Sequence, residues 1–122
     1  MKNPVVATKV NLYLYCLCRN EKVLLTMESI GNDGALIESY FYNKEESCDD
    51  TLNIFAQISA NYLPYLKITL NHTCFPRAYR PVVTFNAFQQ CERNELEKYF
   101  FGSINSFVTL NCYETKFLKY YG

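Results

Sequence analysis

The sequence predicts an α+β fold, with an antiparallel sheet of about five to six strands and two helices packed on it. Three observations lead to this prediction. Several segments alternate apolar and polar side chains, which is typical of strands, and short polar or glycine-containing turns separate them. Two other segments space their apolar side chains as a helix does. The expected order is β-β-β-α-β-β-α-β in one domain spanning residues 1–122, whose 49% hydrophobic content suffices for a core.

The first three strands are expected at residues 9–18, 23–27 and 35–42. In the first of these, Val10, Leu12 and Leu14 alternate with more polar neighbours, which is the period of a strand. A polar turn at residues 19–22 makes the first two strands a hairpin. The third strand follows a strong turn signal, Gly31-Asn32-Asp33-Gly34.

A first helix is expected over residues 47–62. Ser47 can cap its free amides, and Asp50 can reach back to the Ser47 amide in a capping box. Mostly apolar side chains then recur at helical spacing, at Leu52, Phe55, Ala56, Ser59 and Tyr62, and Ile54 and Ile58 widen this stripe. Pro64 ends this helix, because its ring cannot continue the hydrogen-bond ladder.

The second half of the chain predicts strands at residues 65–75, 82–88 and 106–113. Two prolines bias the connecting loop of residues 76–81 toward an extended form. A second helix is expected at residues 92–101, with Leu96, Tyr99 and Phe100 facing inward and Gly102 as its C-cap. Residues 116–122 form an aromatic and basic tail.

The hairpin within residues 12–27, the acidic Glu45-Glu46-Ser47 and the helix after them resemble the Nudix family. In that family a hairpin leads to a glycine-rich loop and a glutamate-rich helix that binds magnesium. The corresponding helix here, residues 50–61, has no Arg-Glu and no Glu-Glu pair, so the resemblance implies a catalytically inactive, degenerate member. Longin-like and profilin-like modules have a similar element order, which therefore does not select among them.

The six cysteines are expected to be reduced core thiols in the cytoplasm, because residues 1–9 contain no apolar run typical of a secretory signal. No run approaches the ~20 apolar residues of a membrane span, so we expect no membrane contact. A zinc site is conceivable if neighbouring strands bring together Cys16, Cys18, His72 and Cys74. Ligands spaced along strands chelate poorly, so we expect these side chains to line the core, His72 to be hydrogen-bonded and neutral, and no metal or cofactor to be bound.

A cysteine nucleophile is the other chemical possibility. Cys48 lies at the start of the first predicted helix, where the helix dipole would lower the pKa of its thiol. The only available base is His72. We expect Cys48 to have no catalytic role and the protein not to be an enzyme.

Charge and aromatic content point to binding. The net charge is zero, but residues 1–50 carry five basic and eight acidic side chains, whereas residues 51–122 carry seven and four. Two segments of the second half combine basic and aromatic side chains. These are the loop with Arg77, Tyr79 and Arg80, and the tail with Lys116, Lys119, Tyr120, Tyr121 and Gly122. Such residues contact phosphates and stack on unpaired bases, and they are equally favoured at protein interfaces.

The sequence therefore predicts a non-catalytic protein that docks on a large assembly and occupies or blocks a functional site. A ribosome or another ribonucleoprotein is the favoured partner, with contacts to ribosomal RNA and proteins and no small-molecule substrate. The alternative is a protein–protein adaptor or inhibitor module, longin-like or Nudix-like, without RNA contact.

Overall fold

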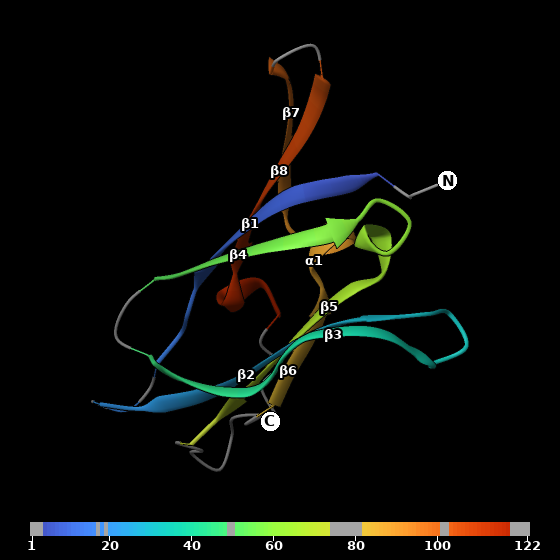
Figure 1. Cartoon of the computed structure of the whole chain (residues 1–122). Coiled ribbons are helices and arrows are strands. Elements are labelled where there is room, and N and C mark those ends of the chain that lie inside the picture. The colour runs from blue at the N-terminus through green and yellow to red at the C-terminus, as the bar shows by residue number, and fades with distance from the viewer. Residues whose placement is uncertain are drawn as a thin grey trace.

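The computed structural model in Figure 1 describes residues 4–16, 18, 20–48, 51–73, 82–100 and 103–117, and of residues 98–100 and 103–105 only the backbone. Strands dominate these residues: β1 (Val5–Tyr13), β2 (Lys22–Ile30), β3 (Leu36–Ser47), β4 (Leu52–Ser59), β5 (Leu66–His72), β6 (Val82–Asn86), β7 (Glu92–Phe100) and β8 (Ser103–Tyr113). The helical segments of this part are the 3-10 turns η1 (Leu63–Tyr65) and η2 (Glu114–Phe117) and the four-residue α1 (Ala87–Gln90). None of them has the length and apolarity that a membrane crossing requires.

The strands form two sheets of four rather than one sheet covered by two helices. Sheet A has the order β4-β1-β8-β7, and sheet B has the order β3-β2-β5-β6. Neighbouring strands are antiparallel except β1 and β8, which are parallel. The α+β prediction is therefore wrong, and with it the Nudix-like, longin-like and profilin-like layering. All six predicted strands are present with shifted ends, and both predicted helices are strands.

The first predicted helix is strand β4, which pairs with β1 from Leu52 to Ser59. Ile54 and Ile58 are buried, and residues four apart share a face in a strand as well as in a helix. The helical pattern and the strand pattern therefore coincide at these two positions. Phe55 distinguishes the two, because the strand turns its side chain outward and leaves it 69% exposed.

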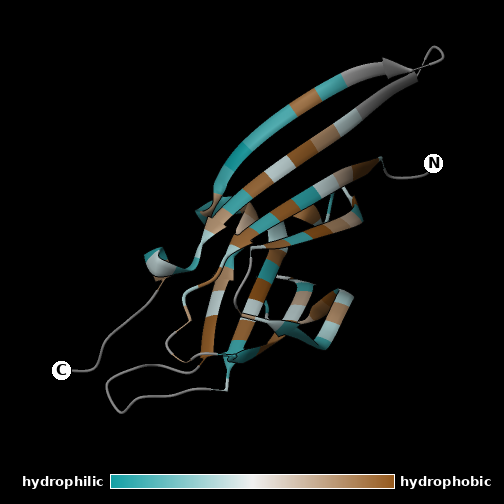
Figure 2. Cartoon of the chain, turned by 90° about the vertical axis from the view of Figure 1, so that its left-hand side faces the viewer, coloured by the Kyte–Doolittle hydropathy of each residue, from teal (hydrophilic) through white to brown (hydrophobic). Residues whose placement is uncertain are grey.

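The second predicted helix is strand β7, which forms a hairpin with β8. The two strands pair from Glu92 with Asn111 to Phe100 with Ser103, and the predicted C-cap Gly102 lies outside the described residues. Leu96, expected to face inward, is 51% exposed. The hairpin projects beyond the rest of sheet A (Figures 1 and 2), so pairing with β8 rather than a buried apolar stripe defines this segment.

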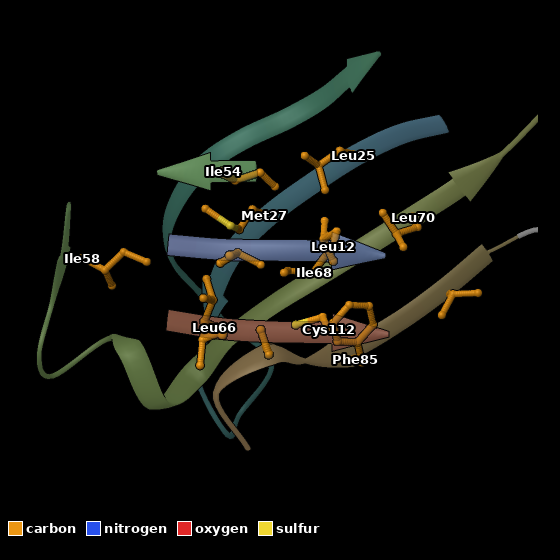
Figure 3. Packing of buried hydrophobic residues seen from close by; sticks show 14 of the residues in the cluster. Leu12, Leu25, Met27, Ile54, Ile58, Leu66, Ile68, Leu70, Phe85 and Cys112 are labelled. Carbon is orange, nitrogen blue, oxygen red and sulfur yellow. The ribbon is translucent and has the colours of Figure 1, made fainter. Parts of the chain in front are cut away.

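The two sheets pack face to face around a single hydrophobic core, shown in Figure 3. The alternation of β1 places Val10 and Leu12 inward with no exposed surface, and β8 contributes Leu110 in the same way. Sheet B faces them with an equally buried set, Val23, Leu25, Met27, Leu66, Ile68 and Leu70. The alternation of apolar and polar side chains that predicted these strands therefore also places the apolar side chains in the core.

The turn between β2 and β3 confirms the glycine-based prediction. The Gly34 amide donates to the Gly31 carbonyl oxygen at 2.9 Å, and the Gly31 amide donates to the Ala35 carbonyl oxygen at the same distance. Gly34 has a φ of +83°, a conformation that side chains disfavour, and the Ala35 amide donates to the Asp33 carboxylate at 3.0 Å.

Truncation of a core leucine tests the packing between the sheets. Leu110→Ala removes a fully buried side chain of sheet A and should lower the free energy of unfolding by about 2–5 kcal/mol, because it leaves a cavity. Leu36→Ala removes a side chain that is 58% exposed and should change it by less than about 0.5 kcal/mol. Urea denaturation of both variants measures the difference. Equal losses would contradict a core at Leu110.

Candidate functional site

Of the predicted binding residues, only Lys116 lies in the described part of the chain. Those that lie outside it are Arg77, Tyr79, Arg80, Lys119, Tyr120, Tyr121 and Gly122. Lys116 belongs to η2, where its Nζ lies 3.6 Å from Oε1 of Glu92 and 5.4 Å from the ring centroid of Tyr113. Its charge is therefore partly balanced by a neighbouring acid.

The cysteines in the described part of the chain are disulfide-bonded, so the expectation of reduced thiols is wrong for them. Cys16 is bonded to Cys48, with 5.9 Å between their Cα atoms, and this bond ties the segment after β1 to the end of β3. Cys91 is bonded to Cys112 at a Cα separation of 4.9 Å and fastens the base of the β7–β8 hairpin. Cys18 is disulfide-bonded as well. The prediction rested on the absence of a secretory signal, which carries no information about which sulfur atoms meet in space.

The disulfides remove both chemical possibilities that the cysteines offered. Donor atoms of Cys16, Glu21 and Cys48 lie within 4.8 Å of one another, the spacing of a cation site. Both of these sulfur atoms belong to one disulfide, however, and a disulfide sulfur is neither a thiolate ligand nor a nucleophile. A zinc site through Cys16 and Cys18, or a nucleophile at Cys48, would therefore require these disulfides to be reduced. Cys74 lies outside the described residues.

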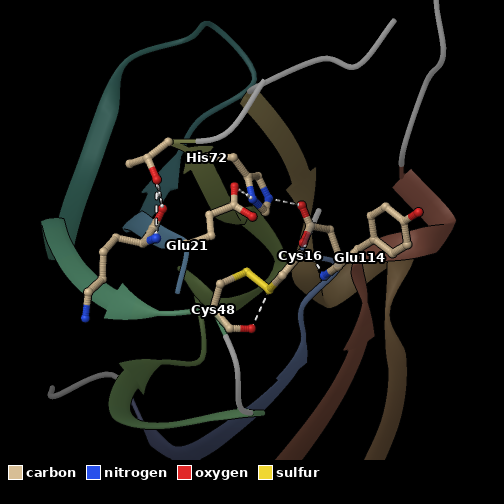
Figure 4. Close-up of polar contacts among 8 residues, drawn as sticks. Cys16, Glu21, Cys48, His72 and Glu114 are labelled. Atoms are coloured by element: carbon tan, nitrogen blue, oxygen red, sulfur yellow. Dashed lines mark hydrogen bonds and ion pairs between the residues drawn. A yellow bond between two sulfur atoms is a disulfide. The ribbon is translucent and has the colours of Figure 1, made fainter. Parts of the chain in front are cut away.

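Beside this disulfide, His72 is buried between two glutamates, as Figure 4 shows. Its Nδ1 lies 3.0 Å from Oε1 of Glu21, and its Nε2 is hydrogen-bonded to Oε2 of Glu114. The three residues are only 1%, 4% and 0% exposed, in the order His72, Glu21, Glu114. We refer to these three residues as the Glu-His-Glu cluster.

Each member of the cluster comes from a different part of the fold. Glu21 immediately precedes β2, and its carbonyl oxygen accepts from the Cys48 amide at 3.0 Å. His72 ends β5, and Glu114 begins η2 directly after β8. The second carboxylate oxygen of Glu114 accepts from the amide of Tyr15, just beyond β1, at 2.8 Å. The cluster thus links the ends of β1 and β8 in sheet A to the ends of β2 and β5 in sheet B.

The two carboxylates favour the charged form of the imidazole. Burial by itself lowers the pKa of His72, but the hydrogen bonds and negative charges of Glu114 and Glu21 outweigh it and raise the pKa above 6.5. His72 in the core is confirmed, whereas the raised pKa favours the charged form over the neutral form that the sequence led us to expect. Because both ring nitrogens are occupied and the side chain has no exposed surface, the cluster fastens the sheets and has no free position for acid–base chemistry.

A different surface is open to solvent, the outer face of sheet A. Phe55, Val5 and Leu96 project from it with 69%, 55% and 51% of their surface exposed. A groove of about 430 Å³ runs over this face between Phe55 of β4 and Phe107 of β8, with the small side chain of Ala7 between them. Sequence reasoning missed this face because it assigned β4 and β7 to helices.

The rest of this outer face carries amides and tyrosines in register. Asn11 of β1 lies opposite Asn111 of β8, and its Nδ2 donates to Oδ1 of Asn111 at 2.9 Å. Tyr13 and Tyr113 stack with ring centroids 4.5 Å apart. Aromatic rings and amides on a broad sheet surface are typical of protein interfaces.

The charge of His72 makes stability depend on pH. Because the pKa of His72 is raised above 6.5 in the folded state, the charged imidazole stabilises the fold fully below pH 6.5. This stabilisation is lost as pH rises through the folded pKa. His72→Gln leaves two buried carboxylates without their cation and should cost about 3–5 kcal/mol. Urea denaturation between about pH 6 and about pH 9 should show this fall in the free energy of unfolding for the wild type and not for the variant. If His72→Gln does not fold, Glu21→Gln should reduce the same pH dependence; an unchanged wild-type stability across this range would refute the charged cluster.

The disulfides should stabilise the fold by restricting the unfolded chain. Cys16 and Cys48 are 32 residues apart and Cys91 and Cys112 are 21 apart, so replacing either pair by alanine should cost about 3–4 kcal/mol. Peptide mapping without reduction should recover both linked pairs from the native protein. Free thiols at these four positions in the native protein would contradict the assignment.

Comparison with known proteins does not assign the chain to a family. No protein-family model matches it, and no curated protein or solved structure matches it significantly.

Proposed function

We propose that this chain is a non-catalytic protein-binding module, a disulfide-bonded β-sandwich that engages a partner protein through the outer face of sheet A. The observation that carries the proposal is the exposure of Phe55, 69%, beside a groove on a sheet face that none of the described elements covers. An aromatic side chain so exposed beside other apolar residues is typical of interaction surfaces.

The chemistry of the groove specifies the partner. Ala7 leaves room for an apolar side chain between Phe55 and Phe107. Nζ of Lys9 lies 5.6 Å from the centroid of the Phe55 ring, at the rim of the same groove. The surface therefore suits a partner that presents an apolar side chain next to a carboxylate, and the tyrosine pair and the asparagines extend the contact with polar groups.

The disulfides favour this proposal over docking on a ribosome. Disulfides persist in oxidising compartments and are rare where glutathione keeps thiols reduced, whereas ribosomes work in a reducing environment. We therefore favour an oxidising compartment over the cytoplasm. Docking on a ribonucleoprotein through Arg77, Arg80 and the tail stays a prediction, and an inhibitor that occludes its partner remains compatible with the proposed binding surface.

Site-specific crosslinking tests the proposed face. A photo-reactive amino acid at position 55 should capture one partner protein from the native source, and the same group at Leu36, also exposed but on sheet B, should not. Lys9→Glu should reduce the yield because it reverses the charge at the groove. Phe55→Asp should abolish co-purification of the partner while changing the free energy of unfolding by less than about 0.5 kcal/mol.

The controls separate the alternatives. Nuclease treatment should leave the crosslinked product unchanged, and loss of the product on treatment would favour the ribonucleoprotein reading. A product of twice the chain's mass would indicate self-association instead of a separate partner. Equal yields at positions 55 and 36 would overturn the proposal.

A further inference from the structure

The inner side of the projecting β7–β8 hairpin lines a half-open pocket of about 460 Å³. Over the rest of sheet A the inner face packs against sheet B, but at this end no strand of sheet B lines the space. It is instead bounded by η1 and α1, with Leu63 and Pro64 on one side and Phe88 on another. This pocket lies on the opposite side of sheet A from the groove at Phe55.

The pocket combines an apolar floor with an acidic wall. The floor consists of apolar side chains, Val6, Ala60, Leu63, Pro64, Phe88 and Val108. The wall is β7, where Glu95 pairs with Val108 and Glu97 pairs with Ser106. Because Val108 is buried on the inner face and residues two apart share a face, both carboxylates lie on the pocket side of the hairpin.

The negative charge of Glu95 is already balanced by Arg93. Nε of Arg93 lies 3.4 Å from Oε1 of Glu95. The same guanidinium sits 3.9 Å from the centroid of the Phe88 ring and donates to the Phe88 carbonyl oxygen at 3.3 Å, which holds it at α1. Among the described residues no cation pairs with Glu97, so the pocket has one negative charge in excess.

We propose that this pocket binds a small organic cation, a primary amine on an aromatic or branched aliphatic body. The volume falls within the range of small-molecule sites, about 300–1,000 Å³. Burying the apolar body against Phe88 and the floor supplies the hydrophobic part of the affinity. The ammonium group donates to Glu97, and a charge-assisted hydrogen bond of this kind fixes its orientation. This inference is independent of the partner protein proposed for the outer face.

Calorimetric titration of the whole protein with 2-(1-naphthyl)ethylamine tests the site. The amine should bind with one-to-one stoichiometry, and its neutral N-acetyl derivative, which has the same aromatic body, should bind at least roughly threefold more weakly. Amide resonances of Phe88 and Ser106 should shift on binding. Shifts confined to residues around Phe55 would place the amine in the other groove and overturn the proposal.

Three variants make the result specific. Glu97→Gln should weaken amine binding roughly threefold and leave the N-acetyl derivative unaffected, whereas Glu45→Gln, an exposed glutamate on β3, should change neither. Ser106→Phe should fill the pocket and abolish binding of both compounds, with thermal unfolding showing that the variant is folded.

Inward charges on an edge strand also discourage strand pairing between molecules. If that were the whole role of the glutamates, Glu97→Gln would promote self-association and leave amine binding unchanged. That outcome, or equal affinity for the amine and its N-acetyl derivative, would refute the amine site.

Discussion

The Glu-His-Glu cluster is the constraint on which the ends of both sheets depend. It holds three ionisable side chains in a region without solvent access, and such groups are tolerated only when they satisfy one another. In its charged form the imidazole supplies two donors, one for each carboxylate, while Glu114 also accepts from the amide of Tyr15, beyond β1. Losing His72 would leave two buried carboxylates without their cation. The geometry of four strand ends is thereby fixed to one arrangement.

The two described disulfides reinforce the fold at two places, one beside the Glu-His-Glu cluster and one away from it. Cys16–Cys48 lies beside the cluster and secures the long segment after β1, whereas Cys91–Cys112 fixes the root of the β7–β8 hairpin. With its base held, the hairpin can project past sheet B and keep both of its faces accessible. Phe117 of η2 stacks on Phe85 of β6 at 4.2 Å and adds a further link between the chain after β8 and sheet B. The rigid core and cross-links therefore position two separate surfaces, the outer groove and the inner pocket.

Much of the fold could be predicted from the sequence, and the errors have a physical cause. Period-two alternation identified six strands and the inward-facing Val10 and Leu12, and Gly31 and Gly34 identified their turn. Strand β4 was missed because the residues from Leu52 to Tyr62 fall at helical spacing, and the buried Ile54 and Ile58 fit a helix as well as a strand. Strand β7 was missed because its charged side chains lie on both faces and give no period-two signal. The core position of His72 was predictable, but Glu21 and Glu114 lie 51 and 42 residues from it, and only the tertiary fold brings them together. The disulfide pairs were unpredictable for the same reason.

The central claim is that a charged His72, shared between two carboxylates, joins the sheets. Nitrogen NMR of protein with labelled histidine tests it most directly, because His72 is the only histidine and its two ring nitrogens report their own protonation. At pH 6.5, the ordinary pKa of histidine, the raised pKa predicts that both nitrogens carry a proton. The shifts should collapse to those of a neutral ring with one bare nitrogen only at higher pH. A neutral tautomer at pH 6.5 would contradict the account.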